Sequence, residues 1–261
     1  MTRSQKIRAR RYTIYGATLA FLALVVVKGN WSKLAQSFFD PEIFAEQFWD
    51  IITIAAKNTL IFTFFGYTLG LALGLVLALM RLSTLKPYRW FAATYIEIMR
   101  GIPLLITLFI IGFGLPVALG VSVPFTYGPG SVALGLVSAA YIAETLRAGI
   151  EAVPKGQLEA ARSLGMSYPQ AMMTIVIPQA FRIVIPSLTN ELVLLIKDTS
   201  LIAVLGTTAA TEELTKFGRS NAASSFNSTP LIAAAVVYLC LTIPLTQLSG
   251  FLERRAKKGR R

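Results

Sequence analysis

The chain has 261 residues, of which 54% are hydrophobic and 15% are charged, and its formal net charge is +12. This composition excludes an ordinary soluble domain, which needs a larger polar surface than these residues supply. With one cysteine, Cys240, and no histidine, the chain has no internal disulfide, no thiolate cluster and no histidine base. We therefore expect a membrane protein without catalytic residues, bound cofactor or metal site.

Six apolar segments approach or exceed the roughly 20 residues that cross a bilayer as a helix. In chain order they cover 12–27, 58–80, 95–119, 131–150, 186–205 and 230–251. The first follows a basic stretch and could pass for a signal peptide, but no small-residue cleavage site follows Val27. We interpret it as a retained anchor helix. The predicted fold class is an all-α membrane protein with about six transmembrane helices.

Lysine and arginine gather at alternating ends of these spans. They flank the first and last spans and occupy the loops 81–89 and 151–182, whereas the segment 28–57 carries Asp40, Glu42, Glu46 and Asp50. Because positive charge concentrates in cytoplasmic loops, we place both termini in the cytoplasm. The expected location is the cytoplasmic (plasma) membrane, crossed several times. The basic ends are expected to meet anionic lipid headgroups and not nucleic acid.

Small and helix-breaking residues mark the second and third spans. Gly66, Gly70 and Gly74 recur every four residues and predict close packing against another helix. Gly101 and Pro103 predict a kink where the third span begins, and Arg100 beside them is expected to snorkel toward headgroups as part of the scaffold. Aromatic and acidic residues over 31–48 suit the membrane interface, as an anchored connector.

Ionisable residues inside spans are costly, so each is a candidate for the substrate pathway. Glu144 precedes Arg147 by three residues, and the two could simply pair with each other. In the fifth span, Lys197 and Asp198 could pair between subunits or line the pathway. Glu191 could bind an ammonium group, and its replacement by alanine is expected to reduce transport without affecting assembly. The predicted pathway residues are Glu144, Asn190, Glu191, Lys197, Asp198, Thr199 and Ser200.

The loop between the fourth and fifth spans has its own helix signals. Pro154 can begin a helix over 156–164, with Leu158, Ala161 and Leu164 on one face. Gly165 tolerates the left-handed conformation that ends such a helix.

A second short helix is expected after this turn. Ser167 and Gln170 form an S-x-x-Q capping box, and the helix would end before Pro178. We expect a helix–turn–helix outside the bilayer, with Ala160 and Ala161 exposed to a partner and Glu159 able to meet a cation on it.

This loop resembles the EAA loop of permease subunits of ABC importers, in the pattern Glu159-Ala160-Ala161-x3-Gly165-x9-Ile175-x2-Pro178. Ile177 stands where the usual loop has leucine. Three further phrases resemble elements of the polar amino-acid branch: Met99-Arg100-Gly101-Ile102-Pro103-Leu104-Leu105, Tyr141-Ile142-Ala143-Glu144 and Lys197-Asp198-Thr199-Ser200-Leu201. The resemblance covers about residues 58–251.

The resemblance implies a five-helix type I ABC importer permease core with one added N-terminal helix. The expected domains are 1–57 (basic N-terminus, extra helix and connector), 58–251 (permease core with the coupling loop 151–182) and 252–261 (basic tail). The coupling residues would be Glu159, Ala160, Ala161, Leu164, Gly165 and Pro178, docking into a separate ATPase.

The function implied is ATP-driven import of a polar amino acid, glutamate- or glutamine-like or related, by alternating access. The chain has no G-x-x-x-x-G-K-[ST] motif, so ATP and Mg would be bound by a partner ATPase dimer. Further partners would be a second permease subunit (a sister chain or a second copy) and an extracytoplasmic amino-acid-binding protein. The alternatives are an ion-driven secondary amino-acid transporter and a membrane scaffold that transports nothing.

Overall fold

The computed structural model describes residues 3–120 and 125–258, and every regular element in them is helical. The first two residues, residues 121–124 of the loop after the third span and residues 259–261 of the predicted basic tail lie outside the described residues. Five helical stretches are long and apolar enough to cross a membrane, and one bent pair of helices brings the number to six. This confirms the predicted fold class.

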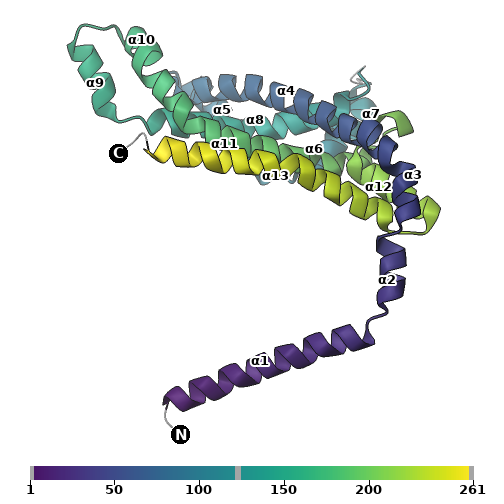
Figure 1. The fold of residues 1–261 in the computed structure, drawn as a ribbon. Helices are drawn as coiled ribbons and strands as arrows, with labels where there is room; N and C mark the ends of the chain where they lie inside the picture. Colours follow the sequence, from purple (N-terminus) through teal and green to yellow (C-terminus); the bar gives the residue numbers. More distant parts are fainter. Residues whose placement is uncertain (1–2, 121–124, 259–261) are drawn as a thin grey trace.

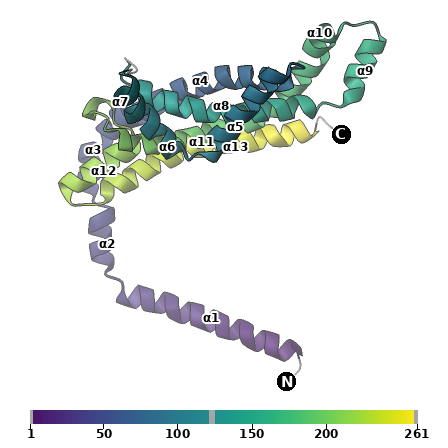
Figure 2. The same ribbon diagram turned by 180° about the vertical axis from the view of Figure 1, so that it is seen from behind.

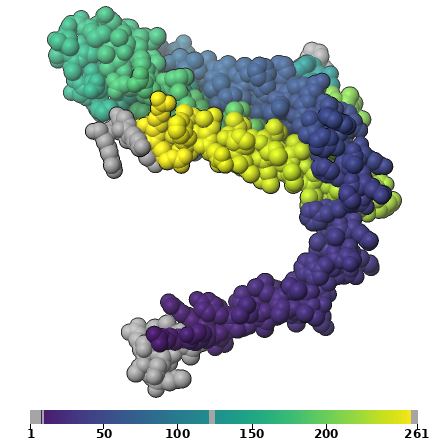
Figure 3. Space-filling model, viewed as in Figure 1, coloured from purple at the N-terminus to yellow at the C-terminus, as the bar shows by residue number. Residues whose placement is uncertain are grey.

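The first helix stands apart from the rest of the molecule. α1 (Arg3–Lys28) and α2 (Trp31–Phe38) extend from one end of the bundle, and a wide gap separates α1 from α13 (Figures 1 and 3). No residue in the most apolar part of α1 is buried. The predicted anchor helix is therefore a single helix that leaves its whole surface for other contacts.

The second span begins earlier than the sequence predicts. α3 (Pro41–Asp50) passes through a π-helical segment, Ile51–Ala56, into α4 (Lys57–Leu82). α3 starts at Pro41 because the carboxylate of Asp40 accepts hydrogen bonds from the backbone amides of Glu42 and Ile43. α2 and α3 run across the direction of α4 at the end of the bundle (Figure 1).

The glycine stripe of α4 packs against α8 (Gly128–Glu151), as predicted. An alanine Cβ at Gly70 would lie 2.0 Å from Ser138 Oγ, and one at Gly74 would lie 2.8 Å from the side chain of Ile142. Such distances leave no room for a methyl group, so the two helices approach each other as closely as glycine allows. α8 lies among the other helices of the bundle, and α4 runs along one edge of it (Figures 1 and 2).

The third span is not the single helix predicted from Tyr95 onward. α5 (Lys86–Gly101) meets α6 (Leu104–Phe109) at an angle of 103°. The helix then continues through the π-helical segment Ile110–Gly114 into α7 (Leu115–Leu119). The bend is sharper than a kink because Ile102, which precedes Pro103, takes an extended conformation.

One continuous helical run replaces two predicted elements. After α9 (Lys155–Ser163), α10 (Tyr168–Ala171) continues through the π-helical segment Met172–Val176 into α11 (Ile177–Asp198). The predictions that a helix ends before Pro178 and that the fifth span begins at Pro186 are therefore wrong.

Both prolines are tolerated for physical reasons. Pro178 is the second residue of α11, just after the π-helical segment, where the hydrogen-bond register changes and a missing N–H is tolerated. Pro186 is buried, and its carbonyl accepts a hydrogen bond from the hydroxyl of Ser249 of the last helix, at 3.0 Å. The hydrogen bond from Ser249 ties this part of α11 to the last helix, which holds the helix in place across the proline.

The connection to the last span contains a helix that the sequence analysis did not predict. A 3₁₀ segment, Thr199–Leu205, is followed by a short 3₁₀ turn, Ala209–Thr211, and by α12 (Leu214–Ser225). α13 (Thr229–Lys258) then runs the length of the bundle, so that α12 lies at one end and α9 with α10 at the other (Figure 1).

Candidate functional site

Two adjoining cavities lie between α5, α8 and α11. Their volumes are about 430 and 450 Å³, and both are lined by Arg100, Tyr141 and Glu191. The first cavity extends along α8 and α11 past Gly149, and the second extends toward Asp198 and Leu195. The two spaces therefore share one cation, Arg100, and one carboxylate, Glu191, while Glu144 lines only the first and Asp198 only the second. We call these two spaces the central cavities.

Arg100 owes its position to the bend of the third span. It is the second-last residue of α5, and the guanidinium carbon lies 5.4 Å from the centre of the Tyr141 ring on α8. That distance is within the range of a cation–π contact. Arg100, which we expected to snorkel toward headgroups, is exposed and also lines both cavities. The sequence signal for this position is that Arg100 directly precedes the helix-breaking residues Gly101 and Pro103.

Glu191 and Asp198 come from the same helix. They are seven residues apart on α11, which is about two turns, and so they share one face of that helix. Both are half-buried, and in the described part of the chain neither carboxylate takes part in an ion pair or a hydrogen bond. Carboxylates at such a place are costly unless a partner neutralises them, so they are available to a cationic group of a ligand.

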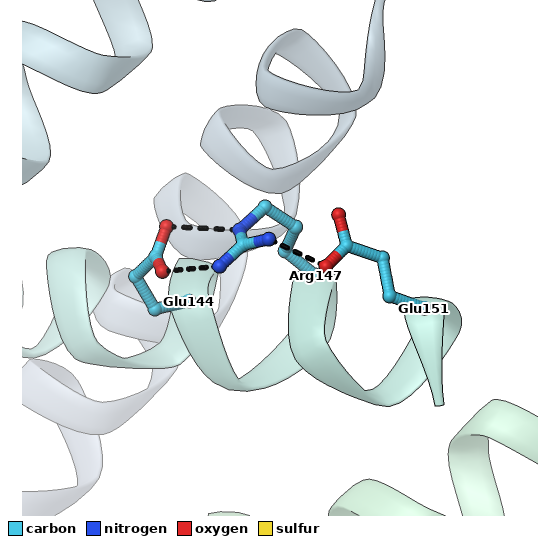
Figure 4. Close-up of polar contacts among 3 residues, drawn as sticks. All are labelled: Glu144, Arg147 and Glu151. Atoms are coloured by element: carbon cyan, nitrogen blue, oxygen red, sulfur yellow. Dashed lines mark hydrogen bonds and ion pairs between the residues drawn. The ribbon is translucent and has the colours of Figure 1, made fainter. Parts of the chain in front are cut away.

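Glu144, unlike Glu191 and Asp198, is paired with a cation. Its carboxylate accepts two hydrogen bonds from Arg147, at 3.1 and 2.8 Å, and Arg147 also donates to Glu151 at 2.6 Å (Figure 4). The predicted pairing of Glu144 with Arg147 is therefore confirmed. Glu144 still lines the first cavity, but its charge is already matched.

The remaining predicted pathway residues do not line the central cavities. Asn190 and Lys197 are exposed on other faces of α11, Ser200 is half-buried, and Thr199 is fully buried with its hydroxyl donating to Ile196 O at 2.6 Å. The structure thus brings together Glu144, Glu191 and Asp198 and leaves the other four outside. The spacing of residues along a helix decides this, since Asn190 and Lys197 each lie about 100° away from the face that carries the two free carboxylates.

Buried polar side chains tie α12 to the bundle. Asn58 of α4 donates to the carbonyls of Ala210 and Glu212, both at 3.0 Å, and accepts from the Tyr127 hydroxyl at 2.7 Å. Thr59 accepts from the amide of Leu214, the first residue of α12. We refer to Asn58, Thr59, Tyr127, Glu213 and Tyr238 as the polar belt.

Glu213 is the most buried charge-bearing residue of the polar belt. Its side chain is 0% exposed, and it caps α12 by accepting from the amides of Thr215 and Lys216, both at 2.7 Å. A third hydrogen bond comes from the Tyr238 hydroxyl of α13 at 2.9 Å. Burial raises the pKa of the Glu213 carboxyl, while these hydrogen bonds act in the opposite direction.

The hairpin formed by α9 and α10 projects from the other end of the bundle. Gly165 has φ +87°, as its predicted role in ending the helix requires, and Ser167 accepts from the amide of Gln170 at 3.3 Å, as the capping box predicts. One prediction is wrong here: Ala161 is buried and not exposed, on the side of α9 that packs toward the π-helical segment Met172–Val176. Leu164, which follows the last residue of α9, is 85% exposed.

Comparison with known proteins places the chain in a family. The family described as "Binding-protein-dependent transport system inner membrane component" matches residues 70–258. The probable glutamine ABC transporter permease protein GlnM of Bacillus subtilis (strain 168) is 39% identical over 202 residues, which are 77% of this chain and 91% of that protein. The arginine transport system permease protein ArtQ of the same organism is 39% identical over 191 residues, 73% of this chain and 85% of that protein.

A solved structure agrees with these relatives. One chain of the crystal structure of an amino acid ABC transporter with histidines superposes with a TM-score of 0.71 at 38% identity, covering 78% of this chain and 93% of that chain. The chain therefore belongs to the family of inner membrane components of binding-protein-dependent transport systems, as an ABC importer permease of the amino-acid branch.

Proposed function

We propose that the chain carries a polar amino acid across the membrane through the central cavities. One observation supports this most directly: Arg100 and the two free carboxylates, Glu191 and Asp198, line the same space. An amino acid presents one carboxylate and one ammonium group, so a space lined by both signs of charge matches it. The names of the relatives, which specify glutamine and arginine transport, agree with this class of substrate.

Each charged group has a role that its chemistry suits. Arg100 would bind the substrate carboxylate, since a guanidinium group donates two parallel hydrogen bonds to a carboxylate. Glu191 or Asp198 would bind the ammonium group. Tyr141, whose ring lies against Arg100, would hold the guanidinium in place.

We propose the orientation that the charge pattern predicts. The end that carries α9 would face the cytoplasm, together with the basic loop 81–89, and the end that carries α12 would face outward. Lysine and arginine residues near span ends set such orientations. An extracytoplasmic amino-acid-binding protein would then deliver substrate on the α12 side.

The α9–α10 hairpin is the proposed contact with a separate ATPase dimer, which would bind ATP and Mg. Exposed Glu159, Ala160 and Leu164 form its outer face, and Gly165 shapes the turn. Ala161 would act from inside, by packing the hairpin against the bundle, and Pro178 would act by shaping the start of α11. A second permease subunit, identical or a sister chain, would complete the pathway.

The experiment removes the charge of one cavity carboxylate. The complex of permease, ATPase and binding protein is reconstituted in vesicles with Glu191→Gln, and uptake of radiolabelled amino acids is measured. We expect uptake to fall about 10-fold or more, because a hydrogen bond to a charged group contributes about 1.5–3 kcal/mol.

Glu97→Gln is the matched control. Glu97 is an exposed carboxylate of α5 that lines neither cavity, one turn before Arg100. Its replacement should leave uptake within about twofold of the unmodified protein, in line with other exposed substitutions. Unchanged uptake and unchanged substrate-stimulated ATP hydrolysis with Glu191→Gln would contradict the proposed function.

A further inference from the structure

The second central cavity is lined by more carboxylates than cations. The ionisable side chains at its wall are Arg100, Glu191 and Asp198, together with the Tyr141 phenol. Neither Glu191 nor Asp198 takes part in an ion pair or a hydrogen bond with any residue that the structure describes. When all three groups are ionised, the cavity has an excess of one negative charge.

Lys197 and Arg147 do not supply the missing positive charge. Lys197 directly precedes Asp198, but it is exposed, lines neither cavity and forms no ion pair in the part of the chain that the structure describes. Arg147 also lines neither cavity, and its guanidinium is bound to Glu144 and Glu151. The excess negative charge is therefore left for a ligand to match.

The charge of the ligand decides how well it fits. Glutamine brings one ammonium and one carboxylate group, so one of the two cavity carboxylates would stay half-buried without a partner, which is costly. Glutamate would add a further negative charge beside them, and like charges repel. A basic amino acid brings two cations and one carboxylate, which match the two carboxylates and the one guanidinium group of the cavity.

We propose that the second cavity selects amino acids with a cationic side chain, such as arginine or lysine, over neutral and acidic ones. The inference deepens the proposed function and rests on it. Arg100 would bind the α-carboxylate, and Glu191 would bind the α-ammonium group. Asp198 would bind the side-chain cation, so it would be the residue that determines specificity.

The places of the three residues support this assignment. The α-carboxylate and the α-ammonium group share one carbon atom, so the groups that bind them must lie close together. Arg100 and Glu191 line both cavities, whereas Asp198 lines only the second. The α-carbon would therefore lie where the two cavities adjoin, with the side chain extending toward Asp198.

The spacing along α11 suits such a ligand. Glu191 and Asp198 lie seven residues apart, which is about 10 Å along the helix axis. The two cationic nitrogens of extended arginine or lysine are about 6–8 Å apart by standard bond lengths. With about 2.8 Å for the hydrogen bond at each end, such a ligand reaches from one carboxylate to the other.

The wall of the second cavity also has an apolar part. Leu194 and Leu195 lie between Glu191 and Asp198 on α11, and Leu134 and Val137 of α8 line the same cavity. The methylene groups of arginine and lysine pack on such a surface while the cation reaches a polar group. This part of the wall therefore suits a long aliphatic side chain that ends in a cation.

The experiment compares the equilibrium binding of two probes, tritiated L-arginine and tritiated L-glutamine. It uses the purified permease–ATPase complex without binding protein, so that the measured selectivity is that of the permease. We expect the Kd of arginine to be about 10-fold or more below that of glutamine, because arginine gains one further hydrogen bond between charged groups. Unlabelled lysine should displace the arginine probe, and unlabelled glutamate should not.

Asp198→Asn is the variant that tests the assignment. It preserves the shape of the side chain and removes its charge, so the Kd of arginine should rise about 10-fold or more while that of glutamine changes by less than about twofold.

Glu97→Gln is the matched control, because it removes a negative charge from an exposed residue that lines neither cavity. It should change neither Kd by more than about twofold. If both variants weakened arginine binding equally, the effect would be a general one of charge, and the direct contact with Asp198 would be wrong.

The outcomes separate this inference from the proposed function. If the unmodified complex binds glutamine or glutamate as tightly as arginine, or if Asp198→Asn keeps the preference for arginine, the specificity inference is wrong and the proposed pathway is still judged by Glu191→Gln. If the unmodified complex binds neither probe, or if Glu191→Gln leaves the binding of both unchanged, the proposed function is wrong and the inference fails with it.

Discussion

The two ends of the bundle hold short helices of opposite character. α9 lies in a hairpin that projects from one end, and the one side-chain hydrogen bond between its residues and α11 is that between Gln179 and Gln157, at 3.5 Å. α12, at the other end, is held by buried hydrogen bonds from α4 and α13. A partner can therefore reach α9 from outside the bundle, whereas α12 is held among the spans by buried hydrogen bonds.

The difference is one of burial and not of length. α9 has a single buried residue, Ala161, whereas the start of α12 includes a fully buried carboxylate, Glu213. Buried polar groups are costly when a hydrogen bond is lost, so they fix geometry more strictly than an apolar contact does. We expect α9 to tolerate surface substitutions and α12 to resist them.

The largest effect is expected from Glu213→Ala. The substitution leaves two backbone amides and the Tyr238 hydroxyl without a buried partner, at roughly 1–3 kcal/mol for each group. The purified permease should melt at a markedly lower temperature or fail to accumulate. Glu159→Ala, at an exposed position of α9, should leave the melting temperature unchanged. Equal melting temperatures for the two variants would contradict the comparison.

A smaller effect, in association and not in folding, is expected from Leu164→Asp. Leu164 is an 85% exposed apolar residue at the tip of the hairpin, and burying a charge there should weaken ATPase binding by about 2 kcal/mol, or roughly 30-fold. Co-purification of the two subunits measures this. Phe226→Asp, at a 97% exposed position after α12, is the control and should leave ATPase binding intact. If the Leu164→Asp variant bound the ATPase as tightly as the unmodified permease does, the proposal that the hairpin contacts the ATPase would be wrong.

The smallest effect is expected on the melting temperature, from alanine substitutions at two glycines that have a left-handed backbone conformation. Gly165 (φ +87°) lies in the hairpin and Gly206 (φ +70°) ends the 3₁₀ segment before α12, and a Cβ would meet no atom within 4 Å at either position. Both alanine variants therefore carry only backbone strain, of about 1–2 kcal/mol. We expect Gly206→Ala to lower the melting temperature by a few degrees, and Gly165→Ala to do so less because the hairpin can relax. The reverse order would show that the hairpin is the more constrained end.

The spans, the glycine stripe and the hairpin turn were predictable because each depends on local chemistry. Gly70 packs against Ser138 as its four-residue spacing predicts, and Gly165 takes the backbone conformation that its position requires. The end of a helix at Pro178 was predicted wrongly, since proline usually breaks a helix and no local signal shows the π-helical segment that accommodates it.

The candidate site was only partly predictable. Glu191 and Asp198 follow from the cost of intramembrane charge, but their relation to Arg100 depends on the 103° bend and on how α5 packs against α8. The polar belt joins residues far apart in the chain, such as Asn58 and Glu212. Such contacts arise from tertiary packing, which no local sequence pattern specifies.

The unbroken helical run from Tyr168 to Asp198 has a mechanical consequence. At 1.5 Å per residue it forms a rod about 45 Å long, with the hairpin at one end and Asp198 at the other. A tilt of only about 5° about its middle would move each end by about 2 Å in opposite directions, by the geometry of a rod of that length. The rod would bend most easily at the π-helical segment and at Pro186. A displacement of the hairpin would therefore be transmitted along the helical run to Asp198. The stiffness of the helix at the π-helical segment and at Pro186 would determine how far Asp198 moves.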